Sequence, residues 1–543
     1  MIMNNLTSLI KTIADFIEQD EDIDPECYAH FIQDPQISIQ VIDFINELDE
    51  SHIEKNPSSY TACIYVLDVC VSQLQSASEN QNKQADKLLN QLMSHLAKTI
   101  QNETHTLSFW LPILNAFYEV HVELSDELKN AYLLLANDES DITFDNEHTH
   151  LNSIRELILE LSDLSVFDIA ENFFAQSYAM PPDFFIDLIL DLYSIEEGQD
   201  IALLALLHPK IEVREVVVET LESLMSTITL SSISLSRLQK IKLWYPANYH
   251  DQFDNWIKIQ RKKEVVFHRE TTHANIIKLK ASEIDGGGAQ GIFIHLRENR
   301  KNKLCGLLFK QTLGIKDAWI TPVISAANVR HYYDDTFDDS LVLRDMDLSY
   351  LNVMTNHFLA CMLEQGDMPN LHLLEIQEEL GLQFFPQKIN PDDVLQQLSV
   401  QINPFTSDAV EASLKRSKNW SHKKRFAESW FIENASVDKL VNQCSSFVNG
   451  VKVCKLDTAI DVIFKDEMEL HRDQWLFHFL WVSLWLKSRP RPNEKTWQDS
   501  FMIAYAIHSG RPLSSIPLLQ ELCRQSVLNS IETMQERKTY LSV

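Results

Sequence analysis

Residues 415–425 combine the side chains best suited to holding an anionic partner. The segment carries six cations around one tryptophan: Lys415, Arg416, Lys418, Trp420, Lys423, Lys424 and Arg425. In a helix, three- to four-residue spacing places Arg416, Trp420 and Lys423 or Lys424 on one face. Cations beside an exposed tryptophan suit RNA, single-stranded DNA or an acidic protein surface. With Trp420 buried, the segment is an ordinary solvated face. A third alternative is that it docks on the acidic first half of the chain.

A second group of cations lies where two expected strands turn: Arg297, Arg300, Lys301 and Lys303. A hairpin with a basic tip can touch phosphates or enter a groove of a nucleic acid. Charged hairpin ends also protect strand edges against aggregation, which is their more frequent role. This hairpin is therefore a second candidate anion site, beside a purely structural alternative.

A glycine-rich loop precedes this hairpin and consists of Asp285, Gly286, Gly287, Gly288 and, after Ala289, Gln290. Bare backbone N–H groups in such a loop can approach an anion. A Walker loop, however, needs a following Gly-Lys-Ser/Thr, and a dinucleotide loop needs a helix after it. Here a strand is expected to follow, and Gln290 stands where a lysine is wanted. The pattern favours a plain tight connection over a phosphate site.

Sequence signatures of metal or covalent chemistry are missing from the chain. The acids between residues 334 and 347 lack the glycine of a calcium loop. His121 and Glu123 have the spacing of a deaminase, but the Pro-Cys-x-x-Cys that completes that site is not there. Neither G-x-S-x-G nor H-E-x-x-H occurs. We expect no metal and no cofactor, and an enzyme with a cleft near residues 285–347 stays only as an alternative.

Charge is divided unequally along the 543 residues, whose formal net charge is −31. Residues 1–250 contain 41 acidic and 12 basic residues, whereas residues 251–543 contain 37 and 35. The first half therefore repels nucleic acid and anionic membranes, and its charge either attracts basic partners or maintains solubility.

The cysteines and the apolar runs indicate the cellular compartment in which the protein is expected. The eight cysteines include no C-x-x-C pair, which suits a reducing compartment. The start of the chain lacks a basic leader, and the longest uncharged aromatic run, residues 474–486, is too short to span a bilayer. We expect a cytoplasmic protein without a transmembrane segment, and its residue usage gives a bacterial impression.

Helices are expected through the first 245 residues, because glycine is absent before Gly198 and apolar residues recur at helical spacing. Within residues 199–226, an apolar run from Ile201 to Leu207 is followed by a His208-Pro209 turn and then by Val213-Arg214 in a second apolar helix. This unit resembles a single HEAT-type repeat. The resemblance implies a stack of helix pairs with an extended surface that holds macromolecules.

The later parts of the chain change character. Residues 275–284, 291–297 and 304–310 alternate or run apolar between turn residues, which predicts an antiparallel β-meander. Helices return from residue 326, including 437–449 and 469–487. We therefore predict a mainly α protein with three parts: an acidic, HEAT-like helical array over 1–245, a basic, glycine-containing α+β region over 246–340, and a C-terminal helical domain over 341–543.

The function that follows is that of a scaffold or adaptor, which binds a protein partner through the helical array and the basic surface. The first alternative is a nucleic-acid-binding protein that uses residues 415–425 and the hairpin at 297–303. The sequence does not define an oligomeric state.

Overall fold

The computed structural model describes residues 2–19, 23–50, 57–79, 82–102, 104–140, 147–268, 274–334, 342–448, 451–489 and 491–540. The chain forms two compact units, Met1–Ser234 and Leu235–Val543. The charge follows this division closely: residues 1–234 hold 41 acidic and nine basic residues, and residues 235–543 hold 37 and 38. The finer division of the chain at residues 245 and 340 stays a prediction.

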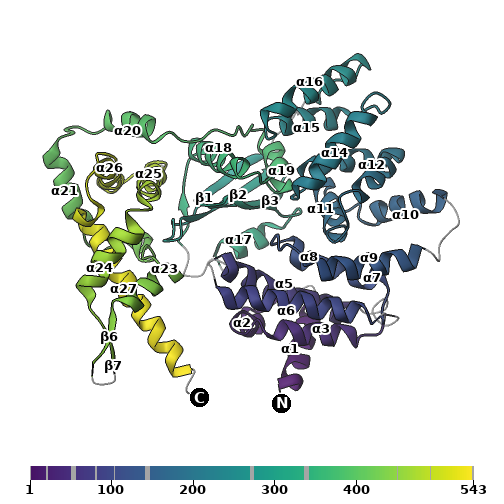
Figure 1. Ribbon diagram of the computed structural model, residues 1–543. Coiled ribbons are helices and arrows are strands. Elements are labelled where there is room, and N and C mark those ends of the chain that lie inside the picture. The colour runs from purple at the N-terminus through teal and green to yellow at the C-terminus, as the bar shows by residue number, and fades with distance from the viewer. Residues whose placement is uncertain are drawn as a thin grey trace. The chain divides into compact units, whose positions relative to one another are not determined.

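The Met1–Ser234 unit is built from helices (Figure 1). In chain order they are α1 Ile2–Glu18, α2 Pro25–Gln33, α3 Ile37–Asn46, α5 Ser58–Glu79, α6 Lys83–Ile100, α7 Leu107–Trp110, α8 Leu114–Tyr118, α9 Asp126–Ser140, α10 Glu147–Glu160, α11 Val166–Gln176, α12 Phe184–Ser194, α13 Gln199–Leu204 and α14 Ile211–Leu224. Short 3₁₀ turns, Leu111–Ile113, Glu196–Gly198 and Ala205–Leu207, join some of them.

Helix α5 is central to this unit, because α1, α2, α3, α6 and α8 all pack against it. The apolar stripe expected from the sequence is buried, including Cys63, Val66, Leu67 and Cys70, each with 0% exposure. One acidic side chain of the same helix, Asp68, also has a buried carboxylate oxygen. The buried face of α5 thus carries an ionisable carboxylate among mostly apolar side chains.

The helix pair α13–α14 has the helix–turn–helix form that the sequence predicts for residues 199–226. Arg214 is buried, and its Nη1 donates to the carbonyl oxygens of His208 and Pro209 at 2.8 and 2.7 Å. The Val-Arg dipeptide thus places a guanidinium where the turn leaves carbonyl groups without helical partners. The first helix is short, six residues followed by a 3₁₀ turn.

The Leu235–Val543 unit contains a five-stranded sheet with the order β4-β3-β2-β1-β5. Its strands are β1 Asn275–Ala281, β2 Ala289–Glu298, β3 Lys301–Lys310, β4 Gly314–Ile320 and β5 Arg344–Asp345. All four pairings are antiparallel, so the expected meander is confirmed and is extended by β4 and β5. Helix α15, Ser232–Lys242, begins at the junction between the two units, and α16, Ala247–Lys262, precedes the sheet.

Helices cover the sheet on both faces. On one face Phe309 stacks on Phe358 of α18, Leu348–Glu364, and Lys303 pairs with Glu379 of α19, Leu371–Leu380. On the other face Leu304 packs with Val329 of α17, Ala326–Asp334.

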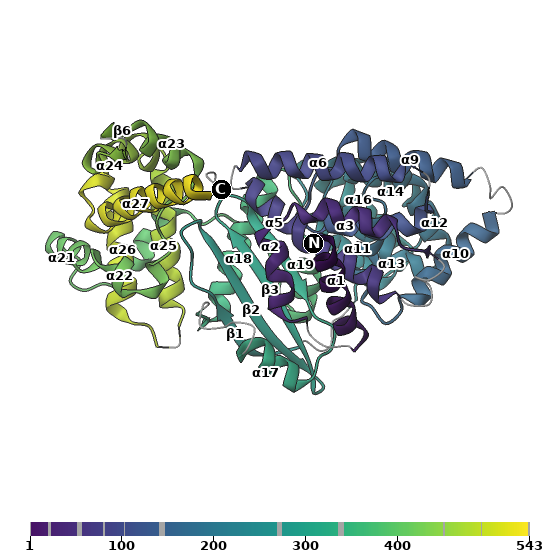
Figure 2. The ribbon, with the colours of Figure 1, turned by 90° about the horizontal axis from the view of Figure 1, so that it is seen from below.

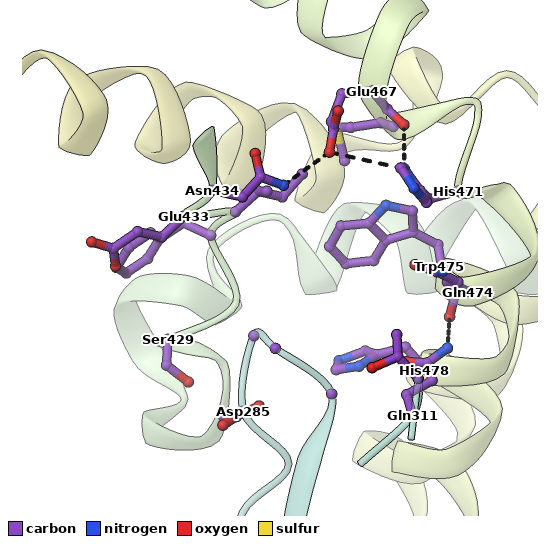
Figure 3. A pocket seen from close by; sticks show the side chains of 17 residues that line it. Asp285, Gln311, Ser429, Glu433, Asn434, Glu467, His471, Gln474, Trp475 and His478 are labelled. Atoms are coloured by element: carbon purple, nitrogen blue, oxygen red, sulfur yellow. Dashed lines mark hydrogen bonds and ion pairs between the residues drawn. The ribbon is translucent and has the colours of Figure 1, made fainter. Parts of the chain in front are cut away.

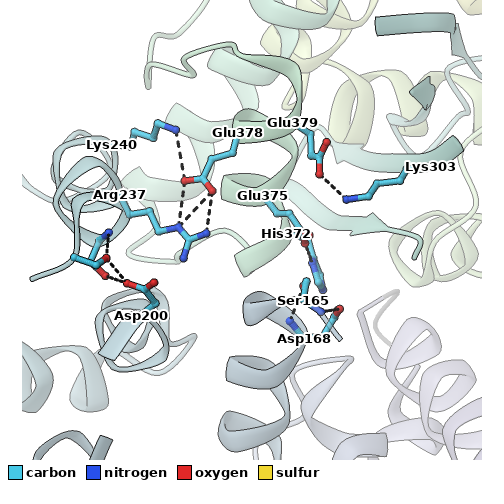
Figure 4. A network of polar contacts seen from close by, with 12 residues as sticks. Ser165, Asp168, Asp200, Arg237, Lys240, Lys303, His372, Glu375, Glu378 and Glu379 are labelled. Atoms are coloured by element: carbon cyan, nitrogen blue, oxygen red, sulfur yellow. Dashed lines mark hydrogen bonds and ion pairs between the residues drawn. The ribbon is translucent and has the colours of Figure 1, made fainter. Parts of the chain in front are cut away.

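Ion pairs link α19 to α15 and to β3 (Figure 4). Arg237 of α15 donates from Nη2 to Glu378 at 3.1 Å, and Lys240 lies 3.5 Å from the same carboxylate. Arg237 is only 7% exposed, so this ion pair is shielded from water.

The β2–β3 hairpin closes through two residues, Asn299 and Arg300, with φ values of 48° and 68°. Both lie in the left-handed region, as a type I′ turn requires, and asparagine tolerates that region better than arginine does. Arg300→Gly is therefore expected to raise the free energy of unfolding by up to about 1 kcal/mol. Urea denaturation measures the change, with Asn299→Gly as the control that should gain less. An unchanged or lower stability for Arg300→Gly contradicts this account.

The remaining helices form the C-terminal part: α20 Pro391–Ser399, α21 Ser407–Ser417, α22 Trp420–Lys423, α23 Ala435–Gln443, α24 Leu456–Ile463, α25 Arg472–Lys487, α26 Glu494–His508 and α27 Pro517–Tyr540. A π-helical turn, Phe464–Met468, joins α24 to the segment before α25. The helix expected over 437–449 is wrong in its second half, because α23 ends at Gln443 and a small hairpin follows, β6 Ser445–Val448 with β7 Val451–Cys454. The mainly α fold with a small antiparallel sheet and C-terminal helices is otherwise confirmed.

Candidate functional site

The basic segment at residues 415–425 divides into a structural part and an exposed part. Trp420 is 4% exposed and packs edge-on against Phe426 and Trp430, so it offers no face to a base. Arg416 donates to Asp499 Oδ1 from Nε at 3.1 Å and from Nη2 at 2.5 Å. The single face of Arg416, Trp420 and a lysine, expected from the sequence, is therefore not available as a binding surface.

Lys423, Lys424 and Arg425 instead line a hollow of about 250 Å³. Two arginines from distant parts of the chain complete it: Arg344 of β5 and Arg489, which follows α25. We call this hollow the basic pocket. Its other lining residues are Phe426, Leu486, Asn493 and Thr496. Five cations thus surround one small concavity, which is an arrangement suited to a phosphate or carboxylate group.

Arg344 is the most enclosed cation of the basic pocket. Its guanidinium lies 5.6 Å from the ring centre of Phe426 and 5.0 Å from that of Trp485. Nη2 donates to Glu283 at 3.0 Å, while Nε is buried and has no hydrogen-bond partner among the residues that the structure describes. Burial lowers the pKa of Arg344 below its ordinary value, and the nearby charge of Arg489 lowers it further. A bound anion would offset both the loss of solvation of Arg344 and its repulsion by Arg489.

The balance of charge in the basic pocket is strongly positive. Within the described part of the chain, Glu283 is the one carboxylate in an ion pair with any of the five cations. Burial raises the pKa of Glu283, which weakens its hold as a counter-ion although Arg344 acts in the opposite direction. Lys423 and Arg425 are exposed at the mouth of the pocket. An arriving anion therefore meets uncompensated charge.

The hairpin cations lie far from the basic pocket. Gly286, just before β2, lies so close to the carbonyl oxygen of Ser429 that an added Cβ would come within 1.9 Å of it. The tip with Arg300 and Lys301 is at the other end of β2, about 30 Å along the strand. Figure 2 shows β2 and β3 running away from the C-terminal helices. The two basic segments of the sequence are thus not one surface.

Only part of the hairpin charge is free. Arg297 donates to Asn302 at 3.1 Å, and Lys303 is held by Glu379 at 2.5 Å. Arg300 and Lys301 remain exposed at the tip. Arg297 is exposed too, and Asn302 is uncharged. These three cations are spread along the end of a narrow hairpin, so they make a weaker anion site than the five around the basic pocket.

The glycine loop is arranged around its own carboxylate. Asp285 Oδ1 accepts from the Ala289 N–H at 2.8 Å, and the N–H groups of Gly287 and Gly288 also favour its charged form. The backbone N–H groups of the loop therefore already bond to Asp285. The carboxylate of Asp285 occupies the place where a phosphate would bind. Gln290 is buried, donates to the Ser282 carbonyl and accepts from Tyr350 at 2.5 Å. The loop supports the sheet, as expected, and Asp285 lines a second, separate cavity.

Sequence reasoning missed Arg344 and Arg489. Arg344 stands alone between acids and apolar residues, and Arg489 stands in a proline-rich stretch with Arg491. Neither neighbourhood carries a local pattern of an anion site, so only the fold identifies them.

Two parts of the chain match models of domains from one family. Residues 392–531 match the Y4lR C-terminal helical domain, and residues 181–264 match the Y4lR second domain. Neither is a HEAT-repeat model, and the second covers α13–α14, so the resemblance of this helix pair to a HEAT repeat stays a prediction. Lys423, Lys424, Arg425 and Arg489 fall inside the matched C-terminal domain, whereas Arg344 lies outside it.

One bacterial relative is the uncharacterised protein y4lR of Sinorhizobium fredii (strain NBRC 101917 / NGR234), which is 24% identical over 315 residues. The similarity covers 57% of this chain and 58% of that protein. No solved structure matches the chain. Among the described residues, no helix has the length and apolar character needed to cross a membrane.

Proposed function

We propose that this chain is an adaptor that captures a phosphorylated segment of a partner protein in the basic pocket. The observation that carries this proposal is the convergence of five cations on one hollow, with a guanidinium Nε left without a partner. Arginine clusters of this kind recognise phosphorylated side chains through charge-assisted, often bidentate hydrogen bonds.

The size of the basic pocket supports a single phosphate group rather than a larger ligand. At about 250 Å³ it lies below the roughly 300–1,000 Å³ typical of pockets for whole small molecules. A nucleic-acid strand would need a groove of cations with exposed aromatic faces. Trp420 and Phe426 are buried, and the hairpin cations lie a strand length away. These features favour a phosphorylated side chain over a nucleic-acid backbone.

The Met1–Ser234 unit supports the adaptor role by a different surface. It carries nearly all of the net negative charge, and α12 exposes Phe184, Ile186 and Leu190. Such a surface suits a basic, amphipathic partner, in keeping with the HEAT-like pair α13–α14. None of the eight cysteines is in a disulfide bond, which supports the proposal of a cytoplasmic protein.

The test compares phosphorylated and plain peptides. A fluorescein-labelled degenerate peptide library centred on phosphoserine should bind the full chain, and the same library with serine should bind at least tenfold more weakly. Lys424→Ala with Arg425→Ala removes two cations of the basic pocket and should weaken phosphopeptide binding by about 10- to 100-fold. Fluorescence anisotropy measures both effects.

The matched control is Lys415→Ala with Lys418→Ala, which removes the same charge from the same segment outside the pocket. This control should leave the affinity within about twofold. Equal binding of the two libraries overturns the proposal. A 12-nucleotide single strand that binds more tightly than the phosphopeptides, and is weakened by the pocket variant, would instead establish the nucleic-acid alternative.

A further inference from the structure

A second cavity of about 420 Å³ lies in the same unit, on the other side of the glycine loop (Figure 3). It is lined by the loop itself, by residues 429 and 431–434 and by the end of the π-helical turn together with the start of α25. We call it the π-helix cavity. Its volume is within the range of pockets that enclose small molecules.

The two hollows have no lining residue in common, but the short segment Glu283–Asp285 connects them. The Trp430 indole N–H donates to the Ile284 carbonyl at 2.8 Å and anchors the middle of this segment. Glu283 on one side of Ile284 faces Arg344 in the basic pocket, and Asp285 on the other side lines the π-helix cavity. The linings of the two hollows therefore have opposite charge.

The charge of the π-helix cavity is negative. Three carboxylates line it, those of Asp285, Glu433 and Glu467, and no lysine or arginine is among the lining residues. Glu467 is buried and already accepts from Asn434 at 3.0 Å and Ser436 at 2.7 Å. Glu433 is exposed at the mouth. Asp285 is exposed as well, but it stands on the glycine loop that lines the cavity and accepts only from backbone N–H groups among the described residues, so it can accept from a ligand. Loss of surrounding water raises the pKa of Asp285, although the backbone N–H groups offset this.

The imidazole of His478 adds no positive charge to the cavity at neutral pH. Burial lowers the pKa of His478 to about 3, so its ring is neutral. Its side chain is only 4% exposed, and Nε2 has no hydrogen-bond partner within the described part of the chain. A buried polar nitrogen without a partner is unfavourable, and a hydrogen bond from a ligand would offset that cost.

The π-helical turn places the remaining polar groups. It sets Glu467 and Met468 at the cavity and leaves the Glu467 carbonyl free to accept from His471 Nδ1 at 2.9 Å. A carbonyl only accepts, so Nδ1 of His471 carries a proton. Turns of this type are frequent at functional sites. Trp475, 9% exposed, supplies an apolar wall.

We propose that the π-helix cavity binds a small organic cation, a primary ammonium compound with an apolar body. The ammonium group bonds to Asp285, while the body packs against Trp475 and Met468 and leaves a polar atom within reach of His478. Acceptors without cations, an aromatic wall and a concave volume of suitable size are the features that such a ligand needs. This site stands apart from the phosphopeptide proposal, since it uses other residues and the opposite charge.

The experiment compares ligands of similar size and shape that carry a positive charge, no charge or a negative charge. Phenethylamine, 2-phenylethanol and 3-phenylpropionate are titrated into the full chain at pH 7 by isothermal calorimetry, with hexylamine and cyclohexylmethylamine as further amines. At least one amine should bind tenfold or more tightly than the alcohol, and the carboxylate should not bind. Asp285→Asn keeps the Oδ1 acceptor of the loop and should weaken amine binding at least tenfold.

Two further variants separate binding from folding. Glu428→Gln removes an exposed acid of the same segment outside the cavity and should leave amine affinity unchanged. His478→Phe keeps a ring of similar size without its nitrogens and should weaken the amines while the thermal midpoint is kept or raised. Equal affinity of amine and alcohol, no binding by any of the three amines, or an Asp285→Asn variant that binds amines normally overturns the proposal.

Discussion

Asp68→Asn is expected to raise the free energy of unfolding of the Met1–Ser234 unit by about 2–4 kcal/mol at pH 7. Burial in the centre of the helical packing raises the pKa of Asp68 to about 8, and the nearby charge of Glu119 adds to this. One carboxylate oxygen is buried with no hydrogen-bond partner among the described residues. Folding at neutral pH therefore requires Asp68 to take up a proton, and asparagine removes that cost.

The pH dependence of this difference has a definite sign. A pKa raised on folding means that the folded chain binds the proton more tightly. The stability associated with it is complete below about pH 4 and is lost as the pH rises towards 8. The gain from Asp68→Asn should therefore be small at pH 4.5 and should grow by about 1.4 kcal/mol per pH unit up to about pH 8. Urea unfolding of the full chain at several pH values, with hydrogen exchange over α5, measures it.

Asp187→Asn is the matched control, because Asp187 is exposed on α12. It should change stability by no more than about 0.5 kcal/mol at any pH. An Asp68→Asn chain that is less stable than the wild type at pH 7, or a gain that does not depend on pH, would show that Asp68 is ionised in the folded protein.

Arg416→Ala is expected to cost about 3 kcal/mol or more of folding free energy, whereas Asp499→Asn should cost about 1 kcal/mol. The pair is asymmetric, since the Asp499 side chain is 6% exposed and that of Arg416 is 48% exposed. Without Arg416, a carboxylate is left buried and uncompensated between α21 and α26. Without the charge of Asp499, the arginine turns to water and keeps its hydrogen bond to Ser413.

The double variant Arg416→Ala/Asp499→Asn tests this asymmetry. It should recover most of the stability lost in Arg416→Ala, because no buried charge remains. Thermal and urea unfolding of the three chains give the coupling free energy. Equal losses for the two single variants would mean that Asp499 is solvated, contrary to its burial.

This asymmetry also bears on the binding test. Arg416 belongs to the basic segment that the sequence suggested as a partner site, and an Arg416→Ala chain would bind poorly for a structural reason. Lys424 and Arg425 line the basic pocket and have no ion-pair partner within the described ranges, unlike Arg416. Replacing them by alanine therefore tests binding rather than stability. Variants of the segment are therefore informative only when their stability is measured alongside.

Local patterns predicted much of the fold and failed at identifiable places. Alternation at 275–281 and the apolar run at 304–310 specified strands because each face of a sheet repeats every second residue. Strand β4 was not expected, since Lys316 and Asp317 interrupt its alternation at the edge of the sheet. The helix expected over 437–449 includes strand β6, although Asn449-Gly450 between the two short apolar runs is a turn signal.

By itself, the sequence determined the helical character of the chain and the partition of charge between its halves, since periodicity and residue counts are local properties. Only the tertiary structure decided which cations act together. In the folded chain Trp420 is buried and Arg416 is paired with Asp499. Arg344 and Arg489, from distant segments, line one pocket together with residues 423–425. The tertiary structure also enclosed His478 beside Asp285 in the π-helix cavity. Convergence of side chains from distant segments depends on long-range packing, and no pattern within one segment records it.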